Sequence, residues 1–315
     1  MNILNIEHVS KVFGEKVVLD DVSYGVHQGD KIGIIGINGT GKSTILKIIG
    51  GLEEPDEGQV ITQNGLRITY LPQMPEFPQG ASVLDYVAEG KWQKDWSTES
   101  EARNVLNKLG ITDHEEKIDH LSGGQKKRVA LARTLVNPCD VLLLDEPTNY
   151  LDEEHIEWLK RYLQDYENAF ILISHDIPFL NSVINLVYHM ENQELNRYVG
   201  DYDHFQEVYE VKKAQLEAAY RRQQQEISEL KDFVARNKAR VSTRNMAMSR
   251  QKKLDKMDVI ELAAEKPKPE FHFKYGRTPG KYIFETKDLV IGYNEPLSRP
   301  VTLSMERGNK IALVG

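Results

Sequence analysis

The sequence predicts an α/β fold organised around a buried parallel sheet, and three observations support this prediction. Apolar runs with the length and composition of buried strands occur at residues 31–35, 141–146 and 169–173. Stretches with helical patterning follow two of these runs after short loops, at residues 44–49 and 153–166. Residues 203–265 show no strand signal, and no glycine occurs from Tyr202 through Lys274. We therefore expect a long helical hairpin after the sheet-containing domain.

The other segments of this domain predict a small antiparallel sheet and a small helical region. Alternating apolar and polar residues predict antiparallel strands at 3–9 and 17–26, and shorter strands are expected at 59–61 and 66–71. Residues 82–120 are expected to be helical, with Ser82 capping one helix and Gly110 ending another over residues 99–109. A longer helix is predicted over residues 126–136.

Length and composition exclude several classes of protein. A chain of 315 residues predicts roughly two domains. The net charge of −8 argues against a chain that is basic throughout, as many nucleic-acid binders are. The single cysteine, Cys139, excludes an intramolecular disulfide and fits a reducing cytosol. There is no signal-peptide pattern and no apolar run near the roughly 18 residues of a membrane span, so we expect a soluble, cytoplasmic protein.

The loop Gly36–Ser43 is the strongest local motif. Its sequence, GINGTGKS, fits G-x-x-x-x-G-K-[ST], and it lies between a predicted strand and a predicted helix. Such a loop lets successive backbone N–H groups point at a phosphate beside the positive end of a helix dipole. Lys42 is expected to reach the β- and γ-phosphates, and Ser43 to bind Mg²⁺. The alternative is a glycine-rich turn without a ligand.

Acidic and polar residues at the ends of two neighbouring strands form a second candidate site. Asp145 and Glu146 end the run at 141–146, where carboxylates of open α/β sheets meet ligands. Asp145 suits Mg²⁺, whereas Glu146 suits polarisation of an attacking water. His175 follows the strand at 169–173 and is a candidate γ-phosphate contact, although a lone histidine is more often structural. Gln73, between two prolines, offers a carbonyl oxygen to a metal or is an ordinary exposed loop residue.

Two weaker signals accompany these residues. The segment Leu121-Ser122-Gly123-Gly124-Gln125 is a second glycine-containing turn that leads into a helix, so it is a second candidate anion site. Phe13 lies in the loop between the first two strands, 23 residues before Gly36, where an aromatic ring could stack on a base. The alternative for Phe13 is an ordinary hydrophobic loop residue.

The segment after the first domain is strongly basic. Leu216, Tyr220, Ile227, Leu230 and Val234 recur at helical spacing, and helical patterning resumes over residues 250–264, so two antiparallel helices with a tip near 240–248 are expected. Residues 231–256 carry a net charge of +7, which leaves −15 for the rest of the chain. This segregation indicates contact with the phosphates of structured RNA, and the alternative is a solvated face of a linker. The candidate contacts are Arg236, Lys238, Arg240, Arg244, Arg250, Lys252 and Lys253.

A repeat begins after a proline-containing linker at residues 265–270. Residues 287–293 parallel residues 7–13, and residues 301–315 parallel residues 22–36. Tyr293 takes the place of Phe13, and Gly315 takes the place of Gly36. We therefore expect a first domain over 1–200, a basic helical hairpin over 201–266, a connecting segment over 267–281, and the beginning of a second, truncated copy over 282–315.

Taken together, these motifs resemble the ATP-binding cassette (ABC) proteins. The matching residues are the Gly36–Ser43 loop, Gln73, LSGGQ at 121–125, VLLLDE at 141–146, Leu151-Asp152 and His175. The LLLDEPTNYLD run, the repeat and the helical linker are similar to the ABC-F class, which comprises ribosome-associated ATPases, including translation factors and antibiotic-resistance proteins. In that class the linker enters the tRNA exit site, and its tip approaches the peptidyl-transferase centre.

The resemblance implies a P-loop NTPase fold, ATP and Mg²⁺ as ligands, and a role for each matching residue. Phe13 would stack on adenine; Ser43, Gln73 and Asp145 would hold Mg²⁺. Glu146, His175 and Gln73 would act in hydrolysis, and Ser122, Gly123, Gly124 and Gln125 would complete the site of the opposite cassette. The phosphates would be held by Gly36, Asn38, Gly39, Thr40, Gly41, Lys42, Ser43 and Thr44.

Two departures from the family pattern lead to further expectations. Only 47 residues separate Gln73 from Leu121, so an additional ribosome-contacting arm is not expected there. With one complete cassette, the chain alone is expected to hydrolyse ATP weakly or not at all. The rival readings are an ATPase subunit of a membrane transporter, a DNA-repair cassette ATPase and a nucleotide-dependent binding module without catalysis. The sequence does not separate a resistance factor from a general translation factor.

Overall fold

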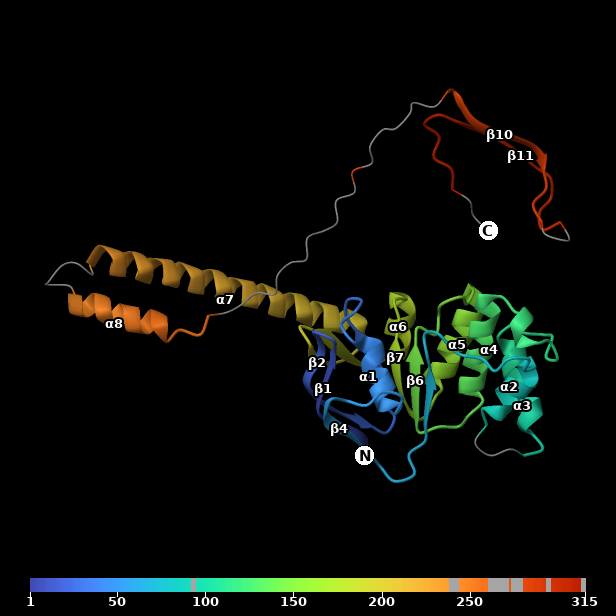
Figure 1. Cartoon of the computed structure of the whole chain (residues 1–315), viewed down its shortest axis with the longest axis horizontal. Coiled ribbons are helices and arrows are strands. Elements are labelled where there is room, and N and C mark those ends of the chain that lie inside the picture. Colours follow the sequence, from blue (N-terminus) through green and yellow to red (C-terminus); the bar gives the residue numbers. More distant parts are fainter. Residues whose placement is uncertain (92–94, 238–243, 260–271, 273–279, 293–295, 313–315) are drawn as a thin grey trace. The chain divides into compact units, whose positions relative to one another are not determined.

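The computed structural model describes residues 1–91, 95–237, 244–259, 272, 280–292 and 296–312 (Figure 1). The chain forms two compact units, Met1–Ala263 and Ala264–Gly315. The first unit contains two sheets, the helices that cover them and the helical hairpin, and the second contains a short strand pair.

A six-stranded sheet in the order β5-β6-β7-β3-β8-β9 forms the centre of the first unit. The predicted buried strands appear as β3 (Lys31–Ile35), β6 (Val141–Asp145) and β7 (Ala169–Ile173), which pair in parallel. β5 (Ile68–Leu71) and β8 (Leu186–Glu191) extend the parallel part, and β9 (Glu194–Val199) pairs antiparallel with β8. The sequence analysis did not predict β8 or β9.

The predicted antiparallel sheet is also present, with longer strands than expected. It has the order β2-β1-β4, formed by β1 (Asn2–Phe13), β2 (Lys16–His27) and β4 (Glu57–Thr62). A loop of two residues joins β1 to β2, so Phe13 is the last residue of a strand.

Seven short helical segments accompany the sheets in this part of the described chain. They are α1 (Lys42–Ile49), α2 (Val83–Glu89), α3 (Thr98–Lys108), the 3₁₀ turn Ile118–His120, α4 (Gly123–Leu135), α5 (Glu153–Gln164) and α6 (Ile177–Val183). Ser82 caps α2 as predicted, by accepting a hydrogen bond from the N–H of Asp85. The start predicted for α4 was three residues too late, because Ser122 and Gln125 form a capping box that begins the helix at Gly123.

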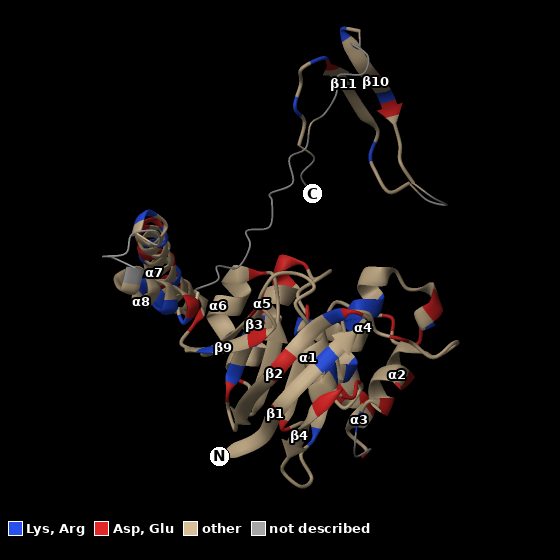
Figure 2. Cartoon of the chain, turned by 60° about the vertical axis from the view of Figure 1, so that its left-hand side comes forward, with Lys and Arg blue, Asp and Glu red and all other residues tan. Residues whose placement is uncertain are grey.

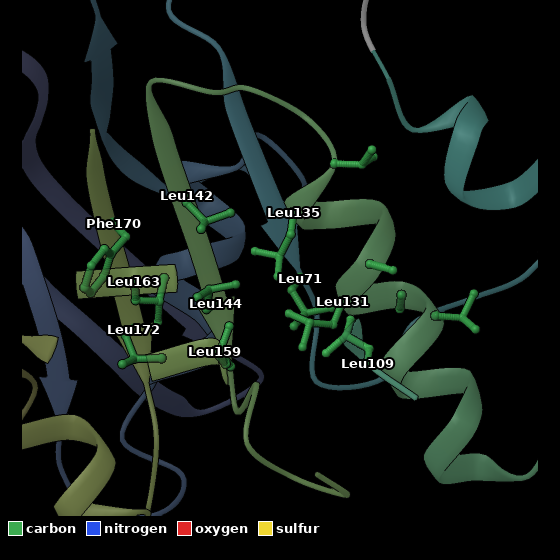
Figure 3. Packing of buried hydrophobic residues seen from close by; sticks show 14 of the residues in the cluster. Leu71, Leu109, Leu131, Leu135, Leu142, Leu144, Leu159, Leu163, Phe170 and Leu172 are labelled. Atoms are coloured by element: carbon green, nitrogen blue, oxygen red, sulfur yellow. The ribbon is translucent and has the colours of Figure 1, made fainter. Parts of the chain in front are cut away.

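Alternate residues of the central strands pack into two cores. Leu142 and Leu144 of β6 face α4 and α5, where Leu131 and Leu135 approach them (Figure 3). Leu143, between them in the sequence, joins the core formed by α1 and the antiparallel sheet. Each fully buried leucine contributes about 1.5–3 kcal/mol relative to an exposed one. The parallel sheet is therefore covered on both faces, which holds the carboxyl ends of β3, β6 and β7 in fixed positions.

The helical hairpin consists of α7 (Tyr202–Asn237) and α8 (Arg244–Asp255). Three contacts show that the helices run antiparallel. As the residue number in α7 rises from one contact to the next, the number of the residue that it contacts falls. The side chain of Gln223 donates to the carbonyl of Asp258, Lys253 Nζ lies 2.6 Å from Glu226 Oε1, and the Arg250 guanidinium lies 3.5 Å from the centre of the Phe233 ring. Ile227, Val234 and Ala247 are buried between the helices.

Two features of the predicted hairpin were wrong. The second helix begins at Arg244 rather than Arg250, so part of the predicted tip at 240–248 is helical. It ends at Asp255 rather than at residue 264, and residues 256–259 are not helical. The predicted apolar stripe is buried at Ile227 and Val234, whereas Leu216 is exposed.

An aromatic cluster packs the base of α7 against β8 and β9. Phe205 is buried against the rings of Tyr198, His189 and Tyr209, whose centres lie 5.0–5.5 Å away. The Tyr209 hydroxyl donates to the Glu191 carboxylate, with O–O distances of 2.9 and 3.1 Å to its two oxygens. The base of α7 is therefore joined to the central sheet by packing and a charge-assisted hydrogen bond.

Acid is expected to destabilise the first unit through His189. Burial lowers the pKa of His189, while Glu191 acts in the opposite direction. The unfolded chain then binds the proton more readily than the folded one, so the free energy of unfolding falls as the pH drops below about 6.5, by at most about 1.4 kcal/mol per pH unit. Urea unfolding at two pH values, about 7.5 and 5.5, should show that the wild type loses more stability between them than His189→Phe does. Equal losses in both proteins would contradict this expectation.

The second unit repeats the backbone geometry of β1 and β2. Its strands β10 (Tyr282–Leu289) and β11 (Val301–Glu306) pair antiparallel. Leu289 lies opposite Val301, as Val9 lies opposite Val22 in the first unit.

The repeat extends to an irregular position. His8 and Asp288 both have positive φ, 52° and 49°, although neither is glycine. The N–H of His8 donates to Ser23 Oγ at 2.8 Å, and that of Asp288 donates to Thr302 Oγ1 at 3.0 Å. The sequence repeat thus has a structural counterpart in the strand pair, whereas Tyr293 and Gly315 lie outside the described residues.

Candidate functional site

The loop Gly36–Ser43 connects β3 to α1, as predicted. Gly36 has φ 152°, and a Cβ atom at this position would lie 2.5 Å from the carbonyl oxygen of Met190 in β8. Gly41 has φ 104°, and a Cβ atom there would collide with Val18. The two glycines therefore allow a turn and a close approach that other residues could not make.

Lys42, the first residue of α1, lies folded back over this loop. Its Nζ donates to the carbonyl oxygens of Gly36 at 2.7 Å and Ile37 at 3.0 Å. Lys42 is buried, and burial lowers its pKa, while Glu146 and Asp145 favour the charged form. An ammonium held by loop carbonyls beside two acids is in place to exchange these partners for phosphate oxygens.

Asp145 ends β6, and Glu146 follows it in a left-handed conformation with φ 54°. Their exposed fractions are 1% and 4%, and burial raises the pKa of both carboxyls. Asp145 Oδ2 and Glu146 Oε1 have no hydrogen-bond partner among the described residues. Because unpaired buried acids are costly, these oxygens fit a site that receives a cation and a polar ligand.

His175 and Gln73 lie beside the two acids. The backbone N–H of His175 donates to Glu146 Oε2 at 3.3 Å, and His175 Nε2 lies 3.4 Å from Glu146 Oε1. Gln73 is exposed and belongs to neither a helix nor a strand, as predicted.

A cavity of about 360 Å³ brings most of the predicted site together. The loop and the start of α1 contribute Asn38, Gly39, Gly41, Lys42, Ser43 and Thr44 to its lining, and Asn149 lines it as well. Gln73, Asp145, Glu146 and His175 complete the lining with Ile173. Asn149 was not among the predicted site residues.

Other predicted residues lie outside this lining. Gly36 lines a neighbouring cavity, and the Thr40 hydroxyl donates to the carbonyl of Ile37 within the loop. Phe13 is 49% exposed at the end of β1, with Lys11 Nζ 5.4 Å from its ring centre. Ser122, Gly123, Gly124 and Gln125 form the start of α4 and do not line the cavity.

The sequence analysis also missed Lys127 of α4. This lysine is 5% exposed, and its Nζ donates to the carbonyl oxygen of Gln73 at 2.9 Å. Lys127 lies between Lys126 and Arg128 in the sequence. Nothing in this run of three basic residues indicates that the side chain of Lys127 is buried.

The chemistry of the cavity fits a nucleotide with Mg²⁺. Lys42 and the N–H groups at the start of α1 suit the phosphates, while Ser43 and the unpartnered Asp145 oxygen suit Mg²⁺. Ser43 already favours the charged form of Asp145. In the described part of the chain there is no group of three or more His, Cys, Asp and Glu side chains that could hold a metal ion.

A glycine loop between β3 and α1, together with two acids at the end of the parallel strand β6 and an added antiparallel sheet, defines a P-loop ATPase of the ABC type. The comparisons agree: a family model described as "ABC transporter" matches residues 19–149, and a second with the same description matches residues 188–273. The chain belongs to the family of ABC transporter ATP-binding proteins. Hydrolysis of ATP is the general activity of this domain.

Known relatives cover nearly the whole chain. It is 56% identical to "Uncharacterized ABC transporter ATP-binding protein YfmM" of Bacillus subtilis over 100% of the chain and 69% of the relative. It is 35% identical to "Putative ATP-binding protein YdiF" of the same organism, again over 100% of the chain and 56% of the relative. With "Probable ATP-binding protein YheS" of Escherichia coli K12 the identity is 29%, over 96% of the chain and 52% of the relative. The chain therefore spans between about half and two thirds of these relatives.

Solved structures confirm the predicted cassette fold. A nucleotide-free ATP-binding cassette from an ABC transporter superposes with a TM-score of 0.54 at 26% identity, covering 67% of this chain and 96% of that one. The ATP-binding subunit of an ABC transporter gives a TM-score of 0.55 at 20% identity, covering 62% and 90%.

Proposed function

We propose that this ABC protein is an ABC-F type ATPase that acts on the ribosome, where its helical hairpin contacts rRNA or tRNA. The observation that carries this proposal is the antiparallel hairpin α7–α8, whose far end, residues 231–256, carries a net charge of +7. The base of α7 lies beside the ATP site. A family model that includes β8, β9 and the hairpin supports treating the hairpin as part of the protein's working structure. A ribosomal role places the protein in the cytoplasm, as a translation factor or as a factor that protects against antibiotics.

The charges of the hairpin separate into two groups. Arg250 and Lys253 are engaged with Phe233 and Glu226, so they hold α8 against α7. Figure 2 shows the positions of Lys and Arg along α7 and α8 in blue. Arg236 and Lys252 are exposed, and the ion pair that Arg236 makes among the described residues is an i,i+4 pair with Asp232 at 3.8 Å. Exposed pairs of this kind contribute little, so Arg236 and Lys252 are the better candidates for phosphate contacts. Lys238 and Arg240 lie outside the described residues, as does the side chain of Arg244.

A second cavity is lined both by residues of the ATP site and by residues at the base of the hairpin. It has a volume of about 420 Å³ and lies between the end of β3 and the base of α7. Gly36, Lys42 and His175 line one side, while Tyr202, Tyr209 and Lys213 line the other. Closure of the loop on phosphates would therefore change the packing at the base of α7.

The signature residues 122–125 complete the proposed mechanism in a second cassette. Because they do not line the cavity that contains Lys42 and Glu146, we propose that they serve a site formed with another cassette. The repeated strand pair β10–β11 supports a second cassette that follows a hairpin over 201–266 and a connecting segment over 267–281.

The transporter ATPase is the remaining alternative. None of the helices in the described ranges is long and apolar enough to cross a membrane. A partner protein could supply such helices, so a transporter role predicts purification with an integral-membrane protein. The basic hairpin favours the ribosomal role, since a transporter subunit has no evident use for it.

Removing the exposed charges of Arg236 and Lys252 is expected to weaken RNA binding. The variant Arg236→Ser/Lys252→Ser should bind bacterial ribosomal RNA about tenfold more weakly than the wild type, and the slope of log affinity against log salt should fall by about 1–2. Filter binding at several salt concentrations measures both quantities. The matched control, Lys287→Ser/Lys310→Ser, removes two exposed charges outside the hairpin. Equal losses in both variants would contradict hairpin contact.

A further inference from the structure

Lys127 is a buried cation that the nucleotide-binding motifs do not account for. It lies two residues after the signature segment, on α4, and is 5% exposed. Burying an ammonium group costs free energy unless it is paired and hydrogen-bonded. Its partners must therefore repay that cost, and they come from the nucleotide end of the sheet.

The carbonyl oxygen of Gln73 is one of these partners, at 2.9 Å from Lys127 Nζ. Gln73 is among the residues that line the cavity with Asp145 and Glu146. Prolines at 72 and 75 flank this segment, which forms no helix or strand that would fix it. The hydrogen bond from α4 therefore restrains the main chain of Gln73 at the edge of this cavity.

The two buried acids act on Lys127 electrostatically. Asp145 and Glu146 both favour the charged form of Lys127. Among the cations that act on Asp145, Lys127 acts more strongly than Lys42 or Lys47. The ammonium thus lies where α4, the Gln73 segment and the end of β6 meet.

We propose that Lys127 is a positioning residue for the Mg²⁺-dependent step: it holds the Gln73 main chain so that the Gln73 side chain faces the acids. This inference rests on the proposed role of Gln73 at Mg²⁺. Because Lys127 belongs to the helix that starts with the signature, a shift of α4 on contact with another cassette would be passed directly to Gln73.

Charge alone would have the opposite effect, which makes the proposal testable. If Lys127 acted only as a positive charge beside Asp145, its removal would strengthen Mg²⁺ binding. If Lys127 positions Gln73, its removal weakens the contribution of Mg²⁺ to ATP affinity. The hydrogen bond and the charge are separated by Lys127→Gln, which keeps a donor, and Lys127→Met, which removes both.

The experiment measures ATP affinity of the full chain with and without Mg²⁺, by equilibrium titration. For Lys127→Met we expect Mg²⁺-free affinity within about twofold of the wild type, and at least a fivefold smaller gain in affinity on adding Mg²⁺. Lys127→Gln should recover most of that gain. In a Gln73→Ala background, Lys127→Met should change the gain by no more than about twofold.

Three results would overturn the inference. The first is an increase in ATP affinity on adding Mg²⁺ that is as large in Lys127→Met as in the wild type, or larger. The second is a loss of this increase in Lys127→Gln equal to that in Lys127→Met. The third is an effect of Lys127→Met that is as large in the Gln73→Ala background as in the wild type. If Lys127→Met does not fold, the other two variants test the inference. Positioning predicts that adding Mg²⁺ raises the ATP affinity of Lys127→Gln nearly as much as that of the wild type, and raises the affinity of Gln73→Ala less. A wild type that binds no ATP would contradict the nucleotide site itself, which is a distinct failure.

Discussion

Replacing Glu146 with glutamine is expected to lower ATP turnover by about a hundredfold or more while ATP binding persists. The carboxylate is buried, its Oε1 has no hydrogen-bond partner among the described residues, and burial raises its pKa. Glutamine has the same shape but does not accept a proton from water. Release of labelled phosphate, measured at several protein concentrations, detects the turnover of the wild type even if it is slow.

The control for this variant is Glu153→Gln, which makes the same chemical change at an exposed position of α5. It should turn over ATP at the wild-type rate. Turnover of Glu146→Gln within about threefold of the wild type would show that another group activates the water. A rate of ATP hydrolysis per protein molecule that does not rise with protein concentration would contradict the proposed need for a second cassette.

The second large effect is expected for Lys42→Ala, which should weaken ATP binding about a hundredfold, or roughly 3 kcal/mol. The ammonium is buried against the carbonyls of Gly36 and Ile37 and faces the cavity, so its loss removes charge-assisted hydrogen bonds to phosphate. Titration with a fluorescent ATP analogue measures the affinity.

Lys47→Ala serves as the matched control, because Lys47 is an exposed lysine on the same helix. Its affinity for ATP should stay within about twofold of the wild type. If both variants lose affinity equally, general electrostatic attraction would explain the loss, and the specific role of Lys42 would be wrong.

The sequence was sufficient for the parts of the fold that depend on local patterns. The strand, loop and helix around Gly36–Ser43 were predicted because a buried apolar run, glycines and a helix start lie next to one another in the chain. β9 was missed because it is an edge strand whose residues are mostly exposed, so it lacks the apolar run that revealed β6 and β7. α8 was misplaced because its register depends on Ala247 packing between the helices, which spacing alone does not reveal.

Part of the candidate site was likewise predicted from local motifs, and part of it was not. The motif residues Lys42, Asp145 and Glu146 were predicted and share one cavity. Lys127 and the cavity at the base of α7 were not predicted, because their contacts join residues that are far apart in the chain. The hydrogen bond between Lys127 and Gln73 spans 54 positions, and no local pattern records it.

We propose that this cassette acts on the ribosome through its hairpin. Co-sedimentation of Glu146→Gln with bacterial ribosomes tests it most directly, with ATP, with ADP and without nucleotide, beside the same protein carrying Arg236→Ser/Lys252→Ser. We predict that Glu146→Gln pellets with ribosomes, most strongly with ATP, and that the two hairpin substitutions reduce the pelleted fraction. No pelleting of Glu146→Gln above a ribosome-free control, in any nucleotide state, would contradict the claim.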